Sequence, residues 1–248
     1  MNYFDVKAKL IDLFEPQKLD GKLDDEWGFL NEVDKNIQKI GYATSLSTDI
    51  IDEAVQNDVD FILTHHDAWD FVYGMKEKCM QLLNKHNMIH AFFHLPLDDA
   101  DFGTSSSLAK ALNLQNCEKA IPEDIYLCSV IGKTEMPISF EQLSNQLTNI
   151  LKEPIRAYQN NNNPIHKVCI TTGGGNLTTD IKVAVEHECD TYITGEYILY
   201  SQLYAKFAGI NLFVGSHTNT EILGVEQMVT QLIADTNIEM LRLSEKNY

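Results

Sequence analysis

Apolar and amphipathic stretches alternate along this chain in the manner of an α/β protein. Apolar residues at helical spacing predict helices at residues 3–14, 48–57, 75–86, 105–112, 139–151, 178–187, 199–207 and 220–233. Short apolar runs bounded by turn residues predict strands at residues 40–45, 59–64, 88–94, 126–132, 167–172, 191–194, 210–214 and 239–243. Apolar strands that alternate with helices indicate mostly parallel sheets flanked by helices on both faces.

The pattern repeats in the second half of the chain, which predicts two lobes. A length of 248 residues can bury a core without disulfides. We place the boundary at the seam near Cys117–Asp124, giving an N-terminal α/β lobe at residues 1–120 and a C-terminal α/β lobe at residues 121–248. The last strand or helix is free to pack back on the first lobe. The polar stretch at residues 15–26 and the asparagine-rich stretch at residues 159–163 are expected to be loops.

Composition narrows the classes of partner. The formal net charge is -17, with 19 basic against 36 acidic residues, so nucleic acid is a poor candidate for a partner. The chain has no apolar run long enough to cross a bilayer and no signal-peptide layout at its start, so we expect a cytoplasmic protein with no membrane partner. The cysteines are odd in number, never occur as CxxC and are expected to be small buried hydrophobes: Cys79, Cys117, Cys128, Cys169 and Cys189.

Potential metal ligands follow four of the predicted strands. Ligands of open α/β sheets gather at the carboxyl ends of strands, where side chains reach a crevice. The imidazoles and carboxylates concerned are His65, His66, His94, Asp98, Glu196, His217 and Glu221. Each taken alone has an ordinary structural explanation. His217 and Glu221, for example, could belong to a helix start capped by Thr218 or Thr220. Their coincidence at four strand ends favours a common site.

The types of ligand indicate the kind of metal. Imidazole and carboxylate together select Zn, Mn, Fe, Co or Ni over Ca or Mg. Five protein ligands exceed what one catalytic zinc usually takes, but they suit two ions that share an aspartate. Two ions about 3.5 to 4 Å apart can lower the pKa of a bridging water and stabilise a developing oxyanion. The Gly173–Gly175 turn lacks a nucleotide-binding fingerprint, and either a phosphate cradle or a tight turn beside a ligand or a strand would explain it.

In order along the chain, five motifs resemble those of the NGG-interacting factor three-like family, whose members are often named GTP cyclohydrolase 1 type 2 homologues. They are Thr64-His65-His66, His94-Leu95-Pro96-Leu97-Asp98, Thr172-Gly173-Gly174-Gly175, Thr194-Gly195-Glu196 and His217-Thr218-Asn219-Thr220-Glu221. The family commonly has Pro where this chain has Asp67, which adds a negative charge beside the ligands, and Gly where it has Ser216. Its amino-terminal Asp-Asn-x-Gly-Leu segment corresponds loosely to residues 25–29.

The resemblance implies a two-lobed α/β fold with a dinuclear metal site between the lobes, in a homohexameric ring. It places the metal ligands at His65, His66, Asp98, His217 and Glu221, with Asp98 as the bridge. His94 and Glu196 then line the same site, where we predict that one of them carries protons during catalysis.

Two functions from different classes fit these residues. The first is a metal-dependent hydrolase of a small molecule or nucleotide, for which GTP cyclohydrolase activity is implied only by the family name. The second is a non-catalytic protein for metal binding, metal delivery or regulatory assembly. A DNA-binding regulator ranks last because of the acidic composition.

Overall fold

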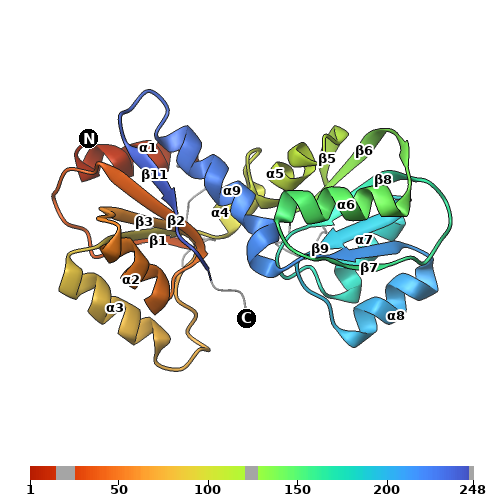
Figure 1. Cartoon of the computed structure of the whole chain (residues 1–248), viewed down its shortest axis with the longest axis horizontal. Coiled ribbons are helices and arrows are strands. Elements are labelled where there is room, and N and C mark those ends of the chain that lie inside the picture. The colour runs from red at the N-terminus through yellow and green to blue at the C-terminus, as the bar shows by residue number, and fades with distance from the viewer. Residues whose placement is uncertain (15–25, 121–127, 246–248) are drawn as a thin grey trace. The chain divides into compact units, whose positions relative to one another are not determined.

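The computed structural model describes residues 1–14, 26–120 and 128–245, and these form two compact units (Figure 1). Unit 1 comprises Met1–Gly103 and Val225–Tyr248, and unit 2 comprises Thr104–Gly224. The boundary therefore lies at residues 103 and 104, so the predicted division at residues 120 and 121 is wrong. The physical reason is that residues 115–120 form a strand of the second sheet. Residues 239–242, near the end of the chain, pair in parallel with residues 39–42 and so belong to unit 1.

Unit 1 is built on a five-stranded sheet in the order β1-β4-β3-β2-β11. Its central pairings are parallel, as predicted, and only the edge strand β1 runs antiparallel, against β4. The strands are β1 (Trp27–Leu30), β2 (Lys39–Ser45), β3 (Phe61–His66), β4 (Ile89–Phe93) and β11 (Glu239–Arg242). The helices are α1 (Tyr3–Leu13), α2 (Thr48–Gln56), α3 (Met75–His86), α4 (Leu95–Asp99) and the second half of α9 (His217–Leu232).

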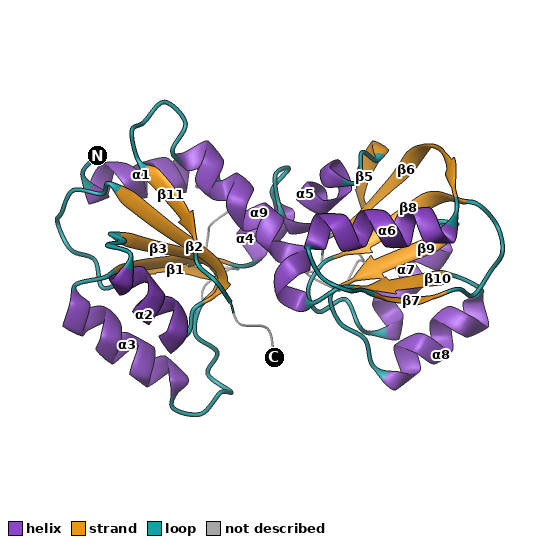
Figure 2. Ribbon diagram, in the orientation of Figure 1, coloured by secondary structure: helices purple, strands orange, loops and turns teal. Residues whose placement is uncertain are grey.

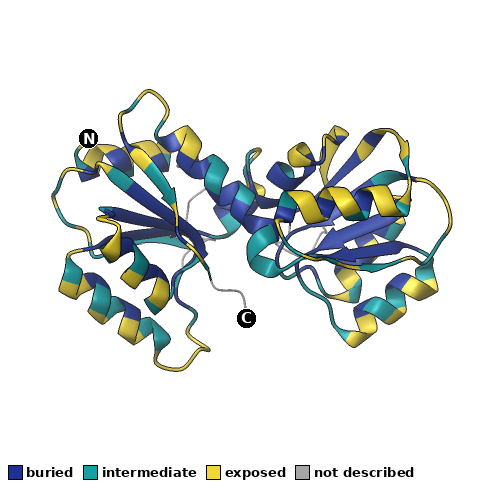
Figure 3. Ribbon diagram, in the orientation of Figure 1, coloured by how far each residue is buried: buried dark blue, intermediate teal, exposed yellow. Residues whose placement is uncertain are grey.

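Helices cover the unit 1 sheet (Figure 2). α2 and α3 bury an apolar stripe that includes Ile51 and Leu83 against the sheet residues Ala43 and Ile62. Ser47 begins α2 because its side chain accepts a hydrogen bond from the backbone N–H of Ile50. The strand interiors are buried (Figure 3), and the polar residues His65 and His66 at the end of β3 are buried with them.

Unit 2 is built on a six-stranded sheet in the order β5-β6-β8-β9-β10-β7. Here the prediction of a mostly parallel sheet is wrong, because only β8, β9 and β10 pair in parallel. The strands are β5 (Gln115–Ala120), β6 (Ser129–Ile138), β7 (Arg156–Tyr158), β8 (Ile165–Thr171), β9 (Thr191–Thr194) and β10 (Asn211–Val214). The helices are α5 (Thr104–Ala111), α6 (Phe140–Leu151), α7 (Thr178–Glu186), α8 (Leu199–Ala208) and the first half of α9.

The two faces of the unit 2 sheet bury separate apolar clusters. α5 and α6 pack on one face, with Leu108 and Leu147 against Ile170. α7 and α8 pack on the other, with Ile181 and Ala205 among the buried residues. Four cysteines are buried as predicted, but Cys117 is exposed. Among the described residues, no helix combines the length and the apolar character that a membrane span requires.

Candidate functional site

In unit 1, three imidazoles gather where β3 and β4 end. The ring centroids of His65 and His66 are 4.4 Å apart, and that of His94 lies 4.9 Å from His65 and 5.0 Å from His66. Their ligand atoms lie within 4.8 Å of one another, so this group could hold a metal ion. β3 and β4 pair in parallel, which brings their carboxyl ends to the same edge of the sheet. The structure therefore brings the side chains of His65, His66 and His94 together within this unit.

The hydrogen bond of His65 fixes which of its nitrogens can bind a metal. His65 Nδ1 lies 3.0 Å from the carbonyl oxygen of Phe93. Because a carbonyl can only accept, Nδ1 is the protonated nitrogen and Nε2 has the lone pair. His65 Nε2 lies 3.6 Å from Asp98 Oδ1, a separation suited to two ligands on ions with bonds of about 2 Å. This carbonyl therefore orients the imidazole in the way that metal-binding histidines are usually oriented.

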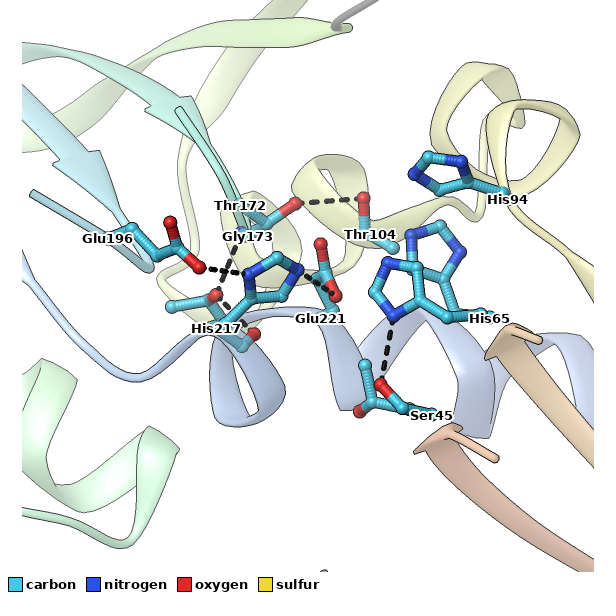
Figure 4. Close-up of polar contacts among 12 residues, drawn as sticks. Ser45, His65, His94, Thr104, Thr172, Gly173, Glu196, His217 and Glu221 are labelled. Carbon is cyan, nitrogen blue, oxygen red and sulfur yellow. Dashed lines mark hydrogen bonds and ion pairs between the residues drawn. The ribbon is translucent and has the colours of Figure 1, made fainter. Parts of the chain in front are cut away.

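His66 is held by β2, which lies on the other side of β3 from β4. Its Nδ1 lies 3.0 Å from Ser45 Oγ (Figure 4). The backbone N–H groups of Thr44 and Ser45 donate in turn to the two carboxylate oxygens of Glu245, at 2.8 and 2.9 Å. Burial raises the pKa of Glu245, against the effect of these two donors. A residue near the carboxyl end of the sequence thus fixes the strand end that supports His66.

α4 positions His94 and Asp98. The predicted strand ended at residue 94 and no helix was predicted before residue 105, but Leu95–Asp99 forms a short helix with Pro96 in its first turn. The turn places Asp98 Oδ2 4.0 Å from His94 Nε2. His94 Nδ1 makes a short hydrogen bond to Glu26 Oε2. Glu26 belongs to an acidic stretch that we interpreted as a solvated loop, and its contact gives it a role in orienting His94.

A fourth imidazole, that of His90 on β4, is fully buried and lies close to the end of β3. His90 Nε2 is 2.8 Å from Thr64 Oγ1, which donates to the backbone oxygen of His66 at 2.7 Å. Burial lowers the pKa of His90 to about 3, so the ring is neutral at physiological pH. Thr64 thus connects His90 to the backbone of the His65-His66 pair, so the role of His90 here is structural.

In unit 2, His217 lies between two carboxylates (Figure 4). Its Nδ1 is 2.7 Å from Glu196 Oε1 and its Nε2 is 3.2 Å from Glu221 Oε2. Burial disfavours the charged ring, but the hydrogen bonds to Glu196 and Glu221 outweigh burial and raise the pKa of His217 to about 10. The hydrogen bond from His217 lowers the pKa of Glu196, whose other oxygen accepts from Asn176 Nδ2 at 2.9 Å.

The start of α9 explains how His217 and Glu221 come to share one face. Ser216 precedes the helix, and its Oγ accepts from the backbone N–H of Asn219 at 3.1 Å. Ser216 therefore caps this helix, not Thr218 or Thr220. Glu153 holds the same turn, since it accepts from the backbone N–H of Ser216 and the side-chain amide of Asn219, both at 2.7 Å. No motif in the sequence marks Glu153, because it comes from a distant segment.

The Gly173–Gly175 turn lies close to the side chains of His217 and Glu221. Gly173 has a φ of 62°, and a Cβ there would lie 1.8 Å from Glu221 Oε1 and 3.0 Å from His217 Nε2. Its N–H donates to Thr220 Oγ1 at 3.1 Å, and its carbonyl accepts from the N–H of Gly195 at 3.1 Å. Of the two explanations offered by the sequence, the tight turn beside a ligand is the one that these contacts support.

Each unit thus offers an oriented imidazole and a carboxylate to a divalent ion. The donors are nitrogen and carboxylate oxygen, which suit Zn, Mn, Fe, Co and Ni. Unit 1 brings together His65, His66, His94 and Asp98, and unit 2 brings together Glu196, His217 and Glu221. The side chains that sequence reasoning missed are Glu26, Ser45, Glu153, Asn176 and Glu245, whose contacts orient or position these residues.

Comparison with known proteins places these features in a family. The family model described as Duf34/NIF3 (NGG1p interacting factor 3) matches residues 1–247. A Haemophilus influenzae protein named GTP cyclohydrolase 1 type 2 homolog is 28% identical over 199 residues, covering 77% of this chain and 78% of that protein. A Methanocaldococcus jannaschii protein with the same name is 27% identical over 218 residues, covering 86% of this chain and 87% of that protein.

Solved structures share the fold. The structure titled protein ybgI, unknown function, has a TM-score of 0.84 at 22% identity and covers 100% of this chain and 99% of its own. Reduced HcgD from Methanocaldococcus jannaschii has a TM-score of 0.82 at 24% identity and covers 99% of this chain and 98% of its own. At these identities the likeness establishes a mixed α/β fold with two sheets flanked by helices.

Proposed function

Because this chain belongs to the Duf34/NIF3 (NGG1p interacting factor 3) family, we propose that it binds two divalent metal ions and hydrolyses a small molecule or nucleotide. The proposed ligands are His65, His66 and Asp98 of unit 1 and His217 and Glu221 of unit 2. Asp98 would be the ligand that the two ions share, as the family resemblance implies.

The observation that carries the proposal is the orientation of one histidine in each unit. His65 is fixed through Nδ1 by a carbonyl and His217 through Nδ1 by a carboxylate, so in both rings Nε2 faces a carboxylate. The separations of 3.6 Å to Asp98 and 3.2 Å to Glu221 fit neighbouring ligands of one ion. Such fixed Nδ1 contacts are typical of metal-binding histidines.

The residues around the ligands suggest how the site would work. Two divalent ions held by these ligands would supply an activated water and would stabilise negative charge that develops during hydrolysis. Glu196 orients His217 and sets its tautomer, as the carboxylates behind metal-binding imidazoles commonly do. His94 can serve either as a further ligand, since it lies with His65 and His66, or as the proton carrier predicted from the sequence.

The names of the curated relatives suggest a class of substrate to test. The curated relatives are named GTP cyclohydrolase 1 type 2 homolog, so a purine nucleotide is the first substrate to assay. The net charge of -17 disfavours the approach of free anions, so the ions themselves would have to attract an anionic substrate.

The test combines metal analysis with a hydrolysis screen. The purified protein should contain about two equivalents of transition metal per chain, and hydrolysis of nucleotides, phosphoesters or cyclic amides should disappear after chelation and return with metal. His94→Gln and Glu196→Gln should lower turnover while most of the metal stays bound. Bound metal with no hydrolysis of any of these classes would instead support the non-catalytic metal-binding function, and metal-free protein would refute both.

A further inference from the structure

The loop between β3 and α3 exposes aromatic side chains directly after two of the candidate ligands. Residues 67–74 join His66 to Met75, the first residue of α3. In this loop Phe71 is 70% exposed and Tyr73 is 96% exposed. Large aromatic rings normally bury most of their surface, and binding residues concentrate on loops that a rigid scaffold positions. The loop therefore has the character of a binding segment beside the unit 1 ligands.

Three rings stand in series from a candidate ligand towards the surface. The ring centroid of Trp69 lies 5.3 Å from that of His66, with the ring planes inclined at 66°. The centroid of Phe71 lies 5.1 Å from that of Trp69, with the planes inclined at only 33°. Both separations are those of interacting aromatic pairs. Trp69 is partly buried, whereas most of Phe71 is exposed, so Phe71 presents an apolar ring to solvent one ring farther from the ligands.

Local contacts fix the conformation of this loop. Lys76 Nζ lies 3.3 Å from Asp67 Oδ2 and 3.2 Å from Asp70 Oδ1. The backbone N–H of Val72 donates to the carbonyl oxygen of Trp69 at 3.1 Å. A ring that is already positioned loses little freedom when a ligand stacks on it. The lysine that the two carboxylates share also reduces the negative charge that the loop presents to an anionic substrate.

The size and chemistry of the exposed surface indicate a small planar ligand. One exposed phenyl ring is far smaller than the roughly 800 Å² per partner that a standard protein interface buries. A flat ring stacks on another flat ring through its π-face, and every nucleobase has such a face. In the proposed function the bond that is hydrolysed lies at the ligands, and the Trp69 ring stands between Phe71 and His66 in the series. The stacked group is therefore distinct from the bond that is cleaved.

We propose that the Trp69–Phe71 stack, defined as these two side chains, determines substrate specificity by binding a planar heterocyclic ring of the substrate. Phe71 contacts that ring, and Trp69 supports Phe71 from behind. The inference rests on the proposed function, which places the reacting group at the ligands. It adds that the substrate carries an aromatic ring joined through a spacer to the reacting group, as a nucleotide carries its base on a ribose phosphate.

The first test measures binding and does not rely on turnover. Calorimetric titration of the Mn²⁺-loaded full chain compares the common ribonucleoside 5′-monophosphates with ribose 5-phosphate, which lacks the base. Each nucleotide should bind more tightly than ribose 5-phosphate by about 5- to 150-fold, the range that stacking on one aromatic side chain contributes. Nucleotides that bind no better than ribose 5-phosphate, or do not bind at all, would overturn the proposal.

Variants of the loop then assign the preference to Phe71. Phe71→Ala and Phe71→Leu both remove the flat face, so each should lower nucleotide affinity by about 5- to 150-fold without changing the affinity for ribose 5-phosphate, whereas Phe71→Trp should retain the preference. Tyr73→Ala is the matched control, because Tyr73 lies in the same loop, is more exposed and, among the described residues, makes no ring contact. Since both side chains are exposed, the circular dichroism spectrum and metal content of these variants should match those of the parent. An equal loss in Y73A, or an equal loss for both kinds of ligand in F71A, contradicts the proposal.

Turnover separates this inference from the proposed function. If nucleotides are hydrolysed, F71A should raise KM as much as it weakens binding and leave kcat within about two-fold, because Phe71 does not touch the bond that is cleaved. If no nucleotide is hydrolysed but F71A abolishes a base-dependent affinity, hydrolysis fails as the function and the ring-binding role of Phe71 stands. Equal hydrolysis of nucleotides and ring-free phosphoesters, unchanged in F71A, would support hydrolysis and refute the ring-binding role.

Discussion

The pKa of His217 tests whether Glu196 and Glu221 contact its ring in solution. The perturbation is Glu196→Gln, which removes one negative charge from the ring and leaves an amide of nearly the same shape. In the parent protein without metal, the two carboxylates raise the pKa of His217 to about 10. A metal ion must then displace a proton from this ring before it can bind.

The expected magnitude follows from the geometry. At pH 8 the ring is two pH units below its pKa, so deprotonation costs about 3 kcal/mol of binding free energy. The 2.7 Å contact with Glu196 is a charge-assisted hydrogen bond, and such bonds contribute roughly 1.5 to 3 kcal/mol. Its loss should lower the pKa of His217 by about 1 to 2 units, into the range of about 8 to 9.

Two measurements report this change. In metal-free protein, the His217 ring resonance should titrate near pH 10 in the parent and one to two units lower in E196Q. Calorimetric titration with Mn²⁺ at pH 9, repeated in buffers of different ionisation enthalpy, counts the protons released. His217 should release about 0.9 proton in the parent and about 0.1 to 0.5 in E196Q. Protons lost from water on the ion contribute similarly to both proteins and cancel in the difference.

A titration midpoint near pH 6.5 for the His217 ring in the metal-free parent protein would refute this prediction, because the ring would then have no effective carboxylate partner. The prediction is also refuted if E196Q changes neither the titration midpoint of His217 nor the number of protons released when Mn²⁺ binds. Either result would mean that Glu196 does not orient this imidazole in solution.

Three further predictions concern the ligands and the turn beside them. Asp98→Ala should remove most of the bound metal in elemental analysis, whereas Asp99→Ala, the matched control, should retain it. Gly173→Ala should destabilise the protein by about 1–3 kcal/mol in urea unfolding, since the residue has positive φ and the added methyl group meets a carboxylate, and Gly174→Ala should cost far less. Without metal, the raised pKa of His217 stabilises the fold fully below about pH 6.5, and this contribution is lost as the pH rises through about 10. The unfolding free energy of chelated protein should therefore fall over this range, and by less in His217→Asn.

The homohexameric ring implied by the family resemblance stays a prediction. The mass of the assembly can be measured by sedimentation equilibrium of the purified protein.

Elements with strong periodicity could be predicted from the sequence, and weakly patterned ones could not. α3 and β9 have the predicted bounds, because each has a clear apolar pattern and a clear end. β5 was missed since five of its six residues are exposed, and β7 was missed since it has only three residues. These edge strands run antiparallel to their neighbours, so missing them also gave the wrong sheet type for unit 2.

The clustering of the candidate ligands within each unit could be predicted for a simple reason. Parallel strands bring their carboxyl ends to one edge, so a histidine after one strand lies near a histidine after the next. No comparable rule predicts the contacts that support these residues. Glu153 and Ser216 are 63 residues apart, and Glu245 and Ser45 are 200 residues apart. Nothing local in the sequence marks either glutamate, because its role depends on tertiary packing alone.

The contact of Glu245 with β2 has a practical consequence for handling this protein. Deleting residues 245–248 would remove the carboxylate that receives the N–H groups of Thr44 and Ser45. Ser45 would then support the His66 ring less firmly. A preparation shortened at that end could lose metal during purification while its secondary structure stayed intact, and its inactivity would be misread as evidence about the natural protein.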